Sequence, residues 1–121
     1  MHALVIDDSR TTRTIISRLL KALDYETIEA ADGHEALRVL ASGELPDIAF
    51  VDWHMPEMSG IEFVQIVRAD RRCDGMRIVM VTSENELDRV SEALAAGANE
   101  YLMKPFNRAA LEEKIALLGA A

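Results

Sequence analysis

Five short apolar runs, separated by segments with helical spacing, constrain the fold of this chain more than any other feature. The runs are Ala3–Ile6, Thr27–Ile28, Ile48–Val51, Ile78–Val81 and Tyr101–Met103. Three of them are continuously apolar and rich in valine and isoleucine, which is typical of strands covered on both faces. Five alternating strand and helix units predict a parallel sheet with right-handed crossovers. We therefore expect an α/β protein, a doubly wound three-layer α/β/α sandwich.

Apolar residues at helical spacing mark the connecting segments, and turn-forming residues mark their ends. The expected buried stripes are Ile15/Leu19/Leu23 with Ile16/Leu20, Ala36/Leu37/Leu40, Ile61/Val64/Val67, Leu87/Val90/Leu94 and Leu111/Ile115/Leu118. Asp32-Gly33 is expected to open the second helix, and Gly97 is expected to close the fourth. Periodicity does not reveal the order of the strands in the sheet.

Length and charge narrow the possible functions. The 121 residues suffice for one domain, which we expect to span 1–121, but are too few for a (β/α)₈ barrel. A net charge of −8 argues against binding of nucleic acid or of an anionic membrane surface. Cys73 is the single cysteine, and the first apolar run ends at two aspartates, so neither an internal disulfide nor a signal peptide or membrane helix is predicted. We expect a soluble, cytoplasmic domain.

Candidate functional side chains follow four of the five apolar runs, whereas the second run leads into Glu29-Ala30-Ala31, which offers nothing comparable. The residues that come directly after a run are Asp7-Asp8, Asp52, Thr82-Ser83 and Lys104-Pro105. Because the carboxyl ends of parallel strands meet at one edge of a sheet, three carboxylates, a hydroxyl and an ammonium group are expected to converge there. Clustered carboxylates repel one another unless a cation is present, and Mg²⁺ binds through one or two carboxylates while keeping waters for a phosphate. The sequence therefore predicts a magnesium site at this edge.

The same groups are those needed to transfer a phosphoryl group onto an aspartate. Asp52 stands alone at the end of its run and is the expected nucleophile, with Asp7 and Asp8 at the metal. No base is needed because an aspartate is already ionised at neutral pH. Lys104 supplies a second positive charge, and Thr82 can donate a hydrogen bond to a phosphoryl oxygen.

Each of these positions also has a purely structural interpretation. Asp8 or Ser9 could cap the first helix, Thr82-Ser83 could cap the fourth, and Lys104 could be a solvated loop residue. Taken together, however, the residues favour the phosphoryl-transfer interpretation. No glycine-rich loop followed by Lys-Ser/Thr is present, which excludes P-loop chemistry.

Five segments in order resemble the receiver domains of two-component response regulators. They are Val5–Ser9, Asp47–Asp52, Met55–Gly60, Val81–Ser83 and Gly97–Phe106. The resemblance covers essentially the whole chain. The spacing of Tyr101 and Lys104, and the few residues after the last helical stripe, are most similar to single-domain chemotaxis regulators.

This resemblance implies a flavodoxin-like sheet of order 2-1-3-4-5 and phosphorylation of Asp52 by a partner histidine kinase. It also implies that Asp8 and Asp52 bind Mg²⁺ directly, that Asp7 does so largely through water, and that the backbone carbonyl of His54 completes the protein ligands. Many relatives have Asn at the position of His54. We expect His54 to change the access of water to the phosphoryl group and so the rate of autodephosphorylation.

The remaining roles that the resemblance implies concern the switch. Thr82 and Lys104 would hold the phosphoryl group, and Tyr101 matches the switch aromatic that turns inward when Thr82 moves. The Lys104-Pro105 peptide bond would be cis, a configuration common only before proline.

Four functions remain open at this stage. The leading one is a stand-alone, monomeric switch that passes its signal to a downstream target protein through the fourth helix, fifth strand and fifth helix. A phosphorelay intermediate that donates to a histidine phosphotransfer protein is the near alternative. A Mg²⁺-dependent phosphatase is less favoured, because such enzymes usually carry the nucleophile on the first strand. An interaction module inert to phosphate is least compatible with the full acceptor set.

Overall fold

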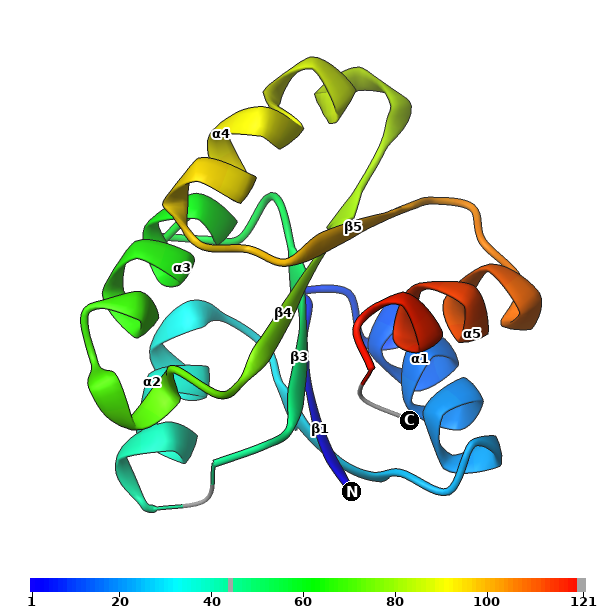
Figure 1. Ribbon diagram of the computed structural model, residues 1–121, viewed down its shortest axis with the longest axis horizontal. Helices are drawn as coiled ribbons and strands as arrows, with labels where there is room; N and C mark the ends of the chain where they lie inside the picture. The colour runs from blue at the N-terminus through cyan, green and yellow to red at the C-terminus, as the bar shows by residue number, and fades with distance from the viewer. Residues whose placement is uncertain (44, 120–121) are drawn as a thin grey trace.

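The computed structural model describes residues 1–43 and 45–119 and has the expected three layers (Figure 1). Its strands are β1 (His2–Ile6), β2 (Glu26–Ala30), β3 (Ile48–Asp52), β4 (Arg77–Thr82) and β5 (Glu100–Met103). Every neighbouring pair is parallel, and the order is β2-β1-β3-β4-β5. Both the doubly wound α/β/α fold and the 2-1-3-4-5 order are thus confirmed.

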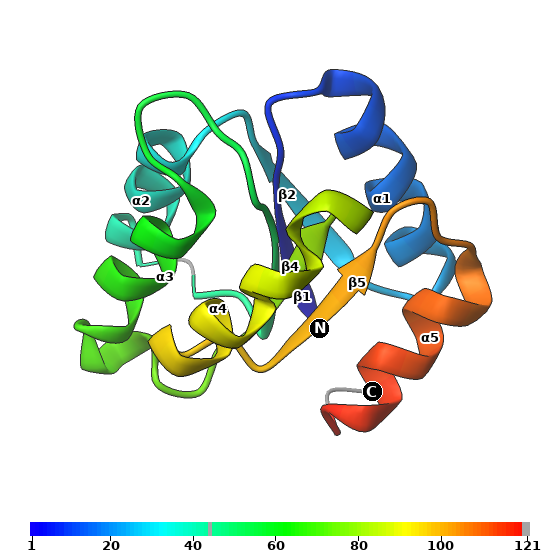
Figure 2. The same ribbon diagram turned by 90° about the horizontal axis from the view of Figure 1, so that it is seen from above.

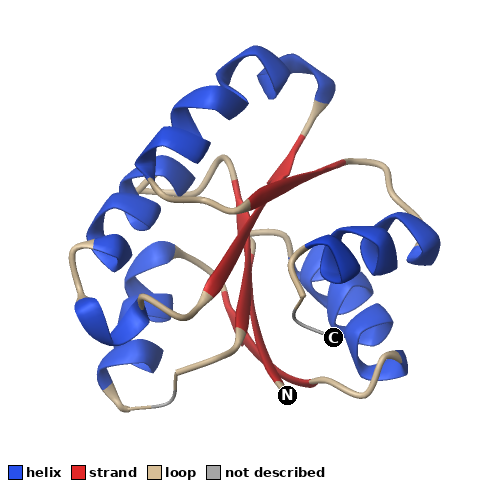
Figure 3. Cartoon of the chain, in the orientation of Figure 1, coloured by secondary structure: helices blue, strands red, loops and turns tan. Residues whose placement is uncertain are grey.

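The helices cover both faces of the sheet. They are α1 (Arg10–Ala22), α2 (Gly33–Ala41), α3 (Gly60–Arg68), α4 (Val90–Ala96) and α5 (Arg108–Leu117). Two short 3₁₀ segments, η1 (Arg71–Cys73) and η2 (Glu84–Arg89), precede β4 and α4. Helices α1 and α5 lie on one face, and α2, α3 and α4 lie on the other (Figures 1 and 2). The strands form the central layer between them (Figure 3). Within residues 1–43 and 45–119, no helix has the length and apolarity needed to cross a bilayer.

Four of the helices have a short polar residue at the N-cap position. The side chains of Ser9, Asp32, Ser59 and Asn107 each accept a hydrogen bond from a backbone N–H of the following first turn. These bonds satisfy backbone donors that have no partner inside the helix. Gly97 ends α4 with φ of 124°, a conformation that favours glycine. The expected start of α2 and end of α4 are therefore confirmed.

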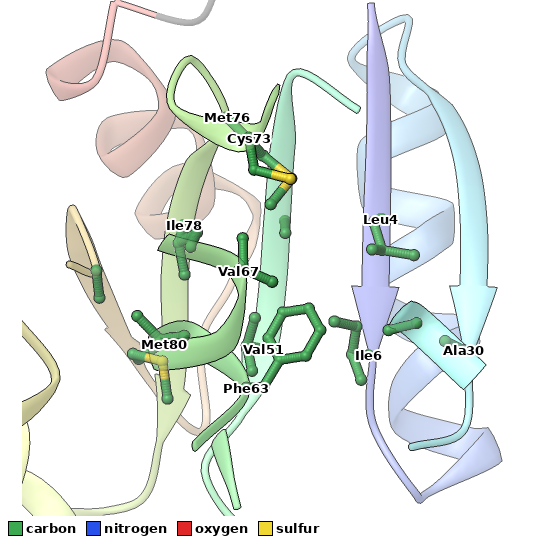
Figure 4. Close-up of a cluster of buried hydrophobic side chains, with 14 of the residues drawn as sticks. Leu4, Ile6, Ala30, Val51, Phe63, Val67, Cys73, Met76, Ile78 and Met80 are labelled. Atoms are coloured by element: carbon green, nitrogen blue, oxygen red, sulfur yellow. The ribbon is translucent and has the colours of Figure 1, made fainter. Parts of the chain in front are cut away.

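The sheet separates two apolar clusters, one on each side. Alternate residues of the central strands point to opposite faces, so Leu4 and Ile6 join the cluster under α2, α3 and α4, while Ala3 and Val5 join the one under α1 and α5. Figure 4 shows the first cluster, where Phe63 of α3 lies against the strand side chains. Burial on both faces is the reason that these runs are continuously apolar.

Two of the expected helical stripes are partly wrong. In α1, Ile15 is about half exposed, whereas Ile16 and Leu20 of the same expected stripe are buried. In the fourth helical segment, Leu87 and Leu94 are exposed, and Val90 is buried there as expected. The residues before Val90 form the 3₁₀ segment η2, whose three residues per turn place Leu87 off the face that α4 buries.

The side chain of Arg68, at the end of α3, connects the segment before β4 with the turn between α4 and β5. Its guanidinium donates to the backbone carbonyls of Gly97 (3.0 Å), Cys73 (2.7 Å) and Met76 (2.7 Å), and to the Oδ1 atom of Asn99 (3.0 Å). Asn99 Oδ1 also accepts from the backbone N–H of Ile78. One planar group with five donors thus holds the end of α4 and the approach to β4 against α3.

We expect Arg68→Lys to lower the free energy of unfolding by about 1–2 kcal/mol, because an ammonium group cannot reach all four acceptors and leaves carbonyls without a partner. Urea unfolding monitored by circular dichroism measures the change. Arg72→Lys is the matched control, since Arg72 is exposed and pairs only locally with Asp70; its effect should stay within about 0.5 kcal/mol. Equal effects of the two substitutions would contradict the role of Arg68.

Candidate functional site

Residues at the carboxyl ends of β1 and β3 form the acidic part of the site. Asp7 directly follows β1, and its backbone N–H continues the sheet by donating to the carbonyl of Ala30 (3.1 Å). Its Oδ1 atom accepts from the backbone N–H of Ser9 (2.8 Å). Asp52 is the last residue of β3. The capping role considered for this segment falls to Ser9, so the carboxylates of Asp7 and Asp8 are not used as helix caps.

The carboxylates of Asp7, Asp8 and Asp52 come together as predicted. One oxygen from each can be chosen so that all lie within 4.8 Å of one another. Asp7 and Asp52 are buried, and Asp8 is exposed to solvent. An all-oxygen, three-carboxylate cluster that is open on one side suits a hard cation that keeps part of its water shell.

Lys104 neutralises part of this charge. Its Nζ atom lies 3.4 Å from Asp7 Oδ2 and 3.4 Å from Asp52 Oδ1. The residue follows β5 and is held by its own backbone N–H, which donates to the carbonyl of Thr82 (2.7 Å). The Lys104-Pro105 peptide bond is cis, as expected. Lys104 is therefore a bridge between two buried carboxylates and not a solvated loop residue.

Burial and the neighbouring charges shift the pKa values of Asp52 and Lys104. Burial, and then the neighbouring Asp7 carboxylate, raise the pKa of Asp52 from 3.8 to about 6, although Lys104 acts in the opposite direction. For Lys104, burial by itself would lower the pKa, but the carboxylates of Asp52 and Asp7 outweigh it and raise the pKa. The single ammonium group does not balance the formal charge of the three carboxylates.

The Thr82 hydroxyl is buried beside this cluster without a hydrogen-bond partner. Thr82 ends β4, one residue beyond Val81, which is paired with Asp52 across the sheet. Its side chain is fully buried, and its Oγ1 atom has no partner among the described residues. Buried hydroxyls are almost always hydrogen-bonded. A group that arrives at Asp52 with oxygen acceptors would supply the missing partner.

The loops after β3 and β4 contact each other through His54 and Glu86. The His54 imidazole is 77% exposed, and its Nε2 atom lies 3.6 Å from Glu86 Oε2. Glu86 is itself nearly buried and accepts from the backbone N–H and the hydroxyl of Ser83. Glu86 was not expected at the site, although Ser83-x-x-Glu86 is the spacing of a capping box. The effect of His54 on autodephosphorylation stays a prediction.

The environment of Trp53 makes it a reporter for this site. Trp53 is the only tryptophan of the chain, follows Asp52 directly and is buried. The guanidinium of Arg89, in η2, lies 5.4 Å from the centroid of its ring. A change in charge at Asp52 or a movement of the loop after β4 therefore reaches the indole directly.

Tyr101 lies on the β5 side of the site, partly buried against the cluster that includes Met80 and Ala93. Lys114 of α5 places its Nζ atom 4.4 Å from the centroid of the Tyr101 ring. The same Nζ atom lies 3.1 Å from Glu100 Oε1. Neither Lys114 nor Glu100 was expected from the sequence, because nothing in their local pattern distinguishes them from solvated surface charges.

Comparison with known proteins agrees with this geometry. The sequence profile of the family described as "Response regulator receiver domain" matches residues 3–116. The chain is 45% identical to the chemotaxis protein CheY of Pseudomonas aeruginosa over 116 residues, which cover 95% of this chain and 93% of that protein. It is 43% identical to the chemotaxis protein CheY1 of Helicobacter pylori, again over 116 residues, with coverage of 95% and 94%.

Solved structures of response regulators also resemble this chain. Chemotaxis response regulator CheY4 of Vibrio cholerae superposes with a TM-score of 0.88 at 36% identity, covering 97% of both chains. A putative response regulator from Chloroflexus aurantiacus superposes with a TM-score of 0.90 at 29% identity, covering 99% of this chain and 98% of that one. The match of the family profile to nearly the whole chain, the sheet order and the acidic cluster beside Lys104 lead to one conclusion: this chain belongs to the response regulator receiver domain family.

Proposed function

We propose that the protein is a phosphorylation-controlled switch of the chemotaxis-regulator type that accepts a phosphoryl group on Asp52. The observation that carries the proposal is the convergence of the Asp7, Asp8 and Asp52 carboxylates with Lys104 at one edge of the sheet. In the proposed reaction, an Asp52 oxygen bonds to phosphorus as the bond from phosphorus to a histidine nitrogen of the donor kinase breaks. Asp52 needs no base, because its carboxylate is mostly ionised above a pKa of about 6.

The residues present fit the Mg²⁺ that receiver domains use at an acidic pocket. Asp7, Asp8 and Asp52 would hold the ion, together with the backbone carbonyl of His54. A bound Mg²⁺ would offset the repulsion among the carboxylates and stabilise the negative charge on the transferring phosphoryl group. The raised pKa of Asp52 supports this assignment, since burial, and after it the Asp7 carboxylate, disfavour an ionised Asp52 that a bound cation would stabilise.

Two residues of this chain would then hold the phosphoryl group. Lys104 already contacts Asp52, and its ammonium group would move from the carboxylate to a phosphoryl oxygen. The buried Thr82 hydroxyl would donate its unused hydrogen bond to another oxygen. Movement of Thr82 toward the site would free space at the end of β4, toward which Tyr101 of β5 would turn.

The signal would leave through the surface made by α4, β5 and α5. A groove of about 350 Å³ lies there, and its lining includes Tyr101, Phe106, Ala110 and Lys114. We propose a histidine kinase as phosphoryl donor and a downstream target protein as the partner of this surface, in the cytoplasm and with the protein as a monomer. A role as phosphorelay intermediate would use the same acceptor site, and transfer of radiolabelled phosphate from the protein to a histidine phosphotransfer protein would distinguish it.

Trp53 fluorescence tests the proposal directly. Addition of Mg²⁺ should change the emission, and subsequent addition of beryllofluoride, a mimic of the phosphoryl group, should change it a second time. Asp52→Asn is the control and should lose the second change, because a neutral amide cannot replace the carboxylate that bonds to beryllium. If wild-type protein responds to neither addition, the phosphoryl-acceptor function is contradicted, and the fold serves another purpose.

A further inference from the structure

A cluster of three residues on β5 and α5 connects the aromatic ring of Tyr101 to a charged pair. Lys114 Nζ lies 4.4 Å from the centroid of the Tyr101 ring and 3.1 Å from Glu100 Oε1. The same Glu100 oxygen accepts from the backbone N–H of Tyr101 at 3.0 Å. We name this group of Glu100, Tyr101 and Lys114 the β5–α5 latch.

The latch differs from the other charged pairs on α5 in its burial. The side chains of Lys114 and Glu100 are only 22% and 23% exposed. By contrast, the Arg108–Glu112 pair on the same helix has side chains 55% and 46% exposed. Exposed pairs contribute little because water screens them, whereas partial desolvation strengthens both the ion pair and the contact of a cation with an aromatic ring.

The position of Lys114 limits where the Tyr101 ring can lie. One oxygen of Glu100 binds both the ammonium group and the backbone of Tyr101, so the ammonium group is fixed relative to the start of β5. The ring keeps its contact with the cation only while it stays at the β5–α5 surface, where it lines the groove. A turn of the ring toward the end of β4 breaks that contact.

We propose that Lys114 is a positioning residue that holds Tyr101 in its outward, half-buried arrangement, and that Glu100 fixes Lys114 in place. This inference rests on the proposed switch function and adds its regulation. The latch sets the fraction of unphosphorylated molecules that adopt the active arrangement. A ligand that requires the minor arrangement binds with an affinity reduced by the fraction of molecules that adopt it. Loss of the latch therefore raises the apparent affinity for beryllofluoride at Asp52, which the latch residues do not contact.

Lys114→Met tests the proposal because it keeps the length of the side chain and removes its charge. The midpoint of the beryllofluoride titration, followed by Trp53 fluorescence in Mg²⁺, should fall roughly twofold to fivefold, the range given by one lost cation–ring contact. Lys114→Arg keeps the cation and should restore a midpoint near that of wild type. Arg108→Met removes one positive charge from the exposed pair of the same helix and should leave the midpoint unchanged.

The ring resonances of Tyr101, recorded by NMR without any phosphoryl mimic, give a second readout. The chain has two tyrosines, so Tyr25 serves as the internal reference. Lys114→Met should shift the Tyr101 signals and leave those of Tyr25 in place.

The two readouts separate failure of the latch from failure of the switch. Unchanged Tyr101 resonances in Lys114→Met overturn the latch, whatever beryllofluoride does. If the Tyr101 resonances shift but the beryllofluoride midpoint of Lys114→Met equals that of wild type, the latch is not coupled to Asp52. If wild-type protein does not respond to beryllofluoride at all, that coupling is overturned and the proposed function has failed as well.

Discussion

In the absence of divalent cations, Asp52→Asn should stabilise the folded protein by about 2–3 kcal/mol at pH 7.5, although it removes the phosphoryl acceptor. The reason is the raised pKa of the Asp52 carboxyl, about 6 in the folded state against an ordinary 3.8. The folded protein binds this proton more tightly than the unfolded chain does. Each unit of pKa corresponds to about 1.4 kcal/mol, which gives the expected magnitude.

The pH dependence follows from the direction of the shift. The proton on Asp52 stabilises the fold fully below about pH 4, and that contribution is lost as the pH rises through about 6. Above this window the ionised carboxylate destabilises the folded protein, because it is buried next to Asp7. Asparagine carries no charge, so the advantage of Asp52→Asn should grow between pH 4 and pH 7 and then level off.

Urea unfolding in EDTA at several pH values measures the effect. Asp88→Asn is the control, since it removes the same charge from an exposed position in η2, and it should change stability by no more than about 0.5 kcal/mol. Mg²⁺ should stabilise the wild-type protein more than Asp52→Asn, because binding to the folded state adds to its stability. Equal stability of the wild-type and Asp52→Asn proteins at pH 7.5 in EDTA would show that the ionised Asp52 carboxylate does not destabilise the fold.

Gly60→Ala should disturb both the stability and the acceptor site, because the first residue of α3 packs against the backbone of β3. A Cβ atom at Gly60 would lie 2.6 Å from the carbonyl oxygen of Asp52 and 2.8 Å from Met80 Cε. The Met80 side chain can move aside, but the Asp52 carbonyl belongs to a central strand and cannot. We expect a loss near the upper end of the ~1–3 kcal/mol typical of overpacking, together with weaker beryllofluoride binding.

Gly75→Ala is the matched control for this prediction. No heavy atom lies within 4 Å of a Cβ atom at Gly75, so the same added methyl group meets open space. Thermal unfolding and the Trp53 titration should both remain close to wild type for Gly75→Ala. If Gly60→Ala behaves the same way, the close approach of α3 to Asp52 does not constrain the site.

The strands were predictable because the signal that marks them is local. Strands buried on both faces must be continuously apolar, which made the runs around Val5, Phe50 and Val79 visible in the sequence. One error in the expected buried residues, at Leu87, occurred where the local structure departs from a regular α-helix. The segment before Val90 forms a 3₁₀ turn, and no spacing of apolar residues announced this change.

The acidic site was also predictable, for a topological reason. Asp7, Asp8 and Lys104 come directly after a strand, and Asp52 and Thr82 are the last residues of theirs. Parallel strands bring all of these positions to one edge of the sheet whatever the details of packing. Residue type and position after a strand were sufficient to assemble the cluster. Their individual roles with Mg²⁺ and phosphate remain part of the proposal.

Other features were decided only by the tertiary structure. The contact of His54 with Glu86, the four acceptors of Arg68 and the placement of Lys114 over Tyr101 join side chains from different elements. They depend on how each helix is rotated and on the few ångströms that separate neighbouring loops. A sequence pattern shows which face of a helix is apolar, but not which polar side chain at its edge meets a partner. The sequence by itself therefore determined the strands of the sheet and which side chains meet at its edge. The packing of the helices decided which residues surround those side chains, because such contacts depend on distances that no local pattern encodes.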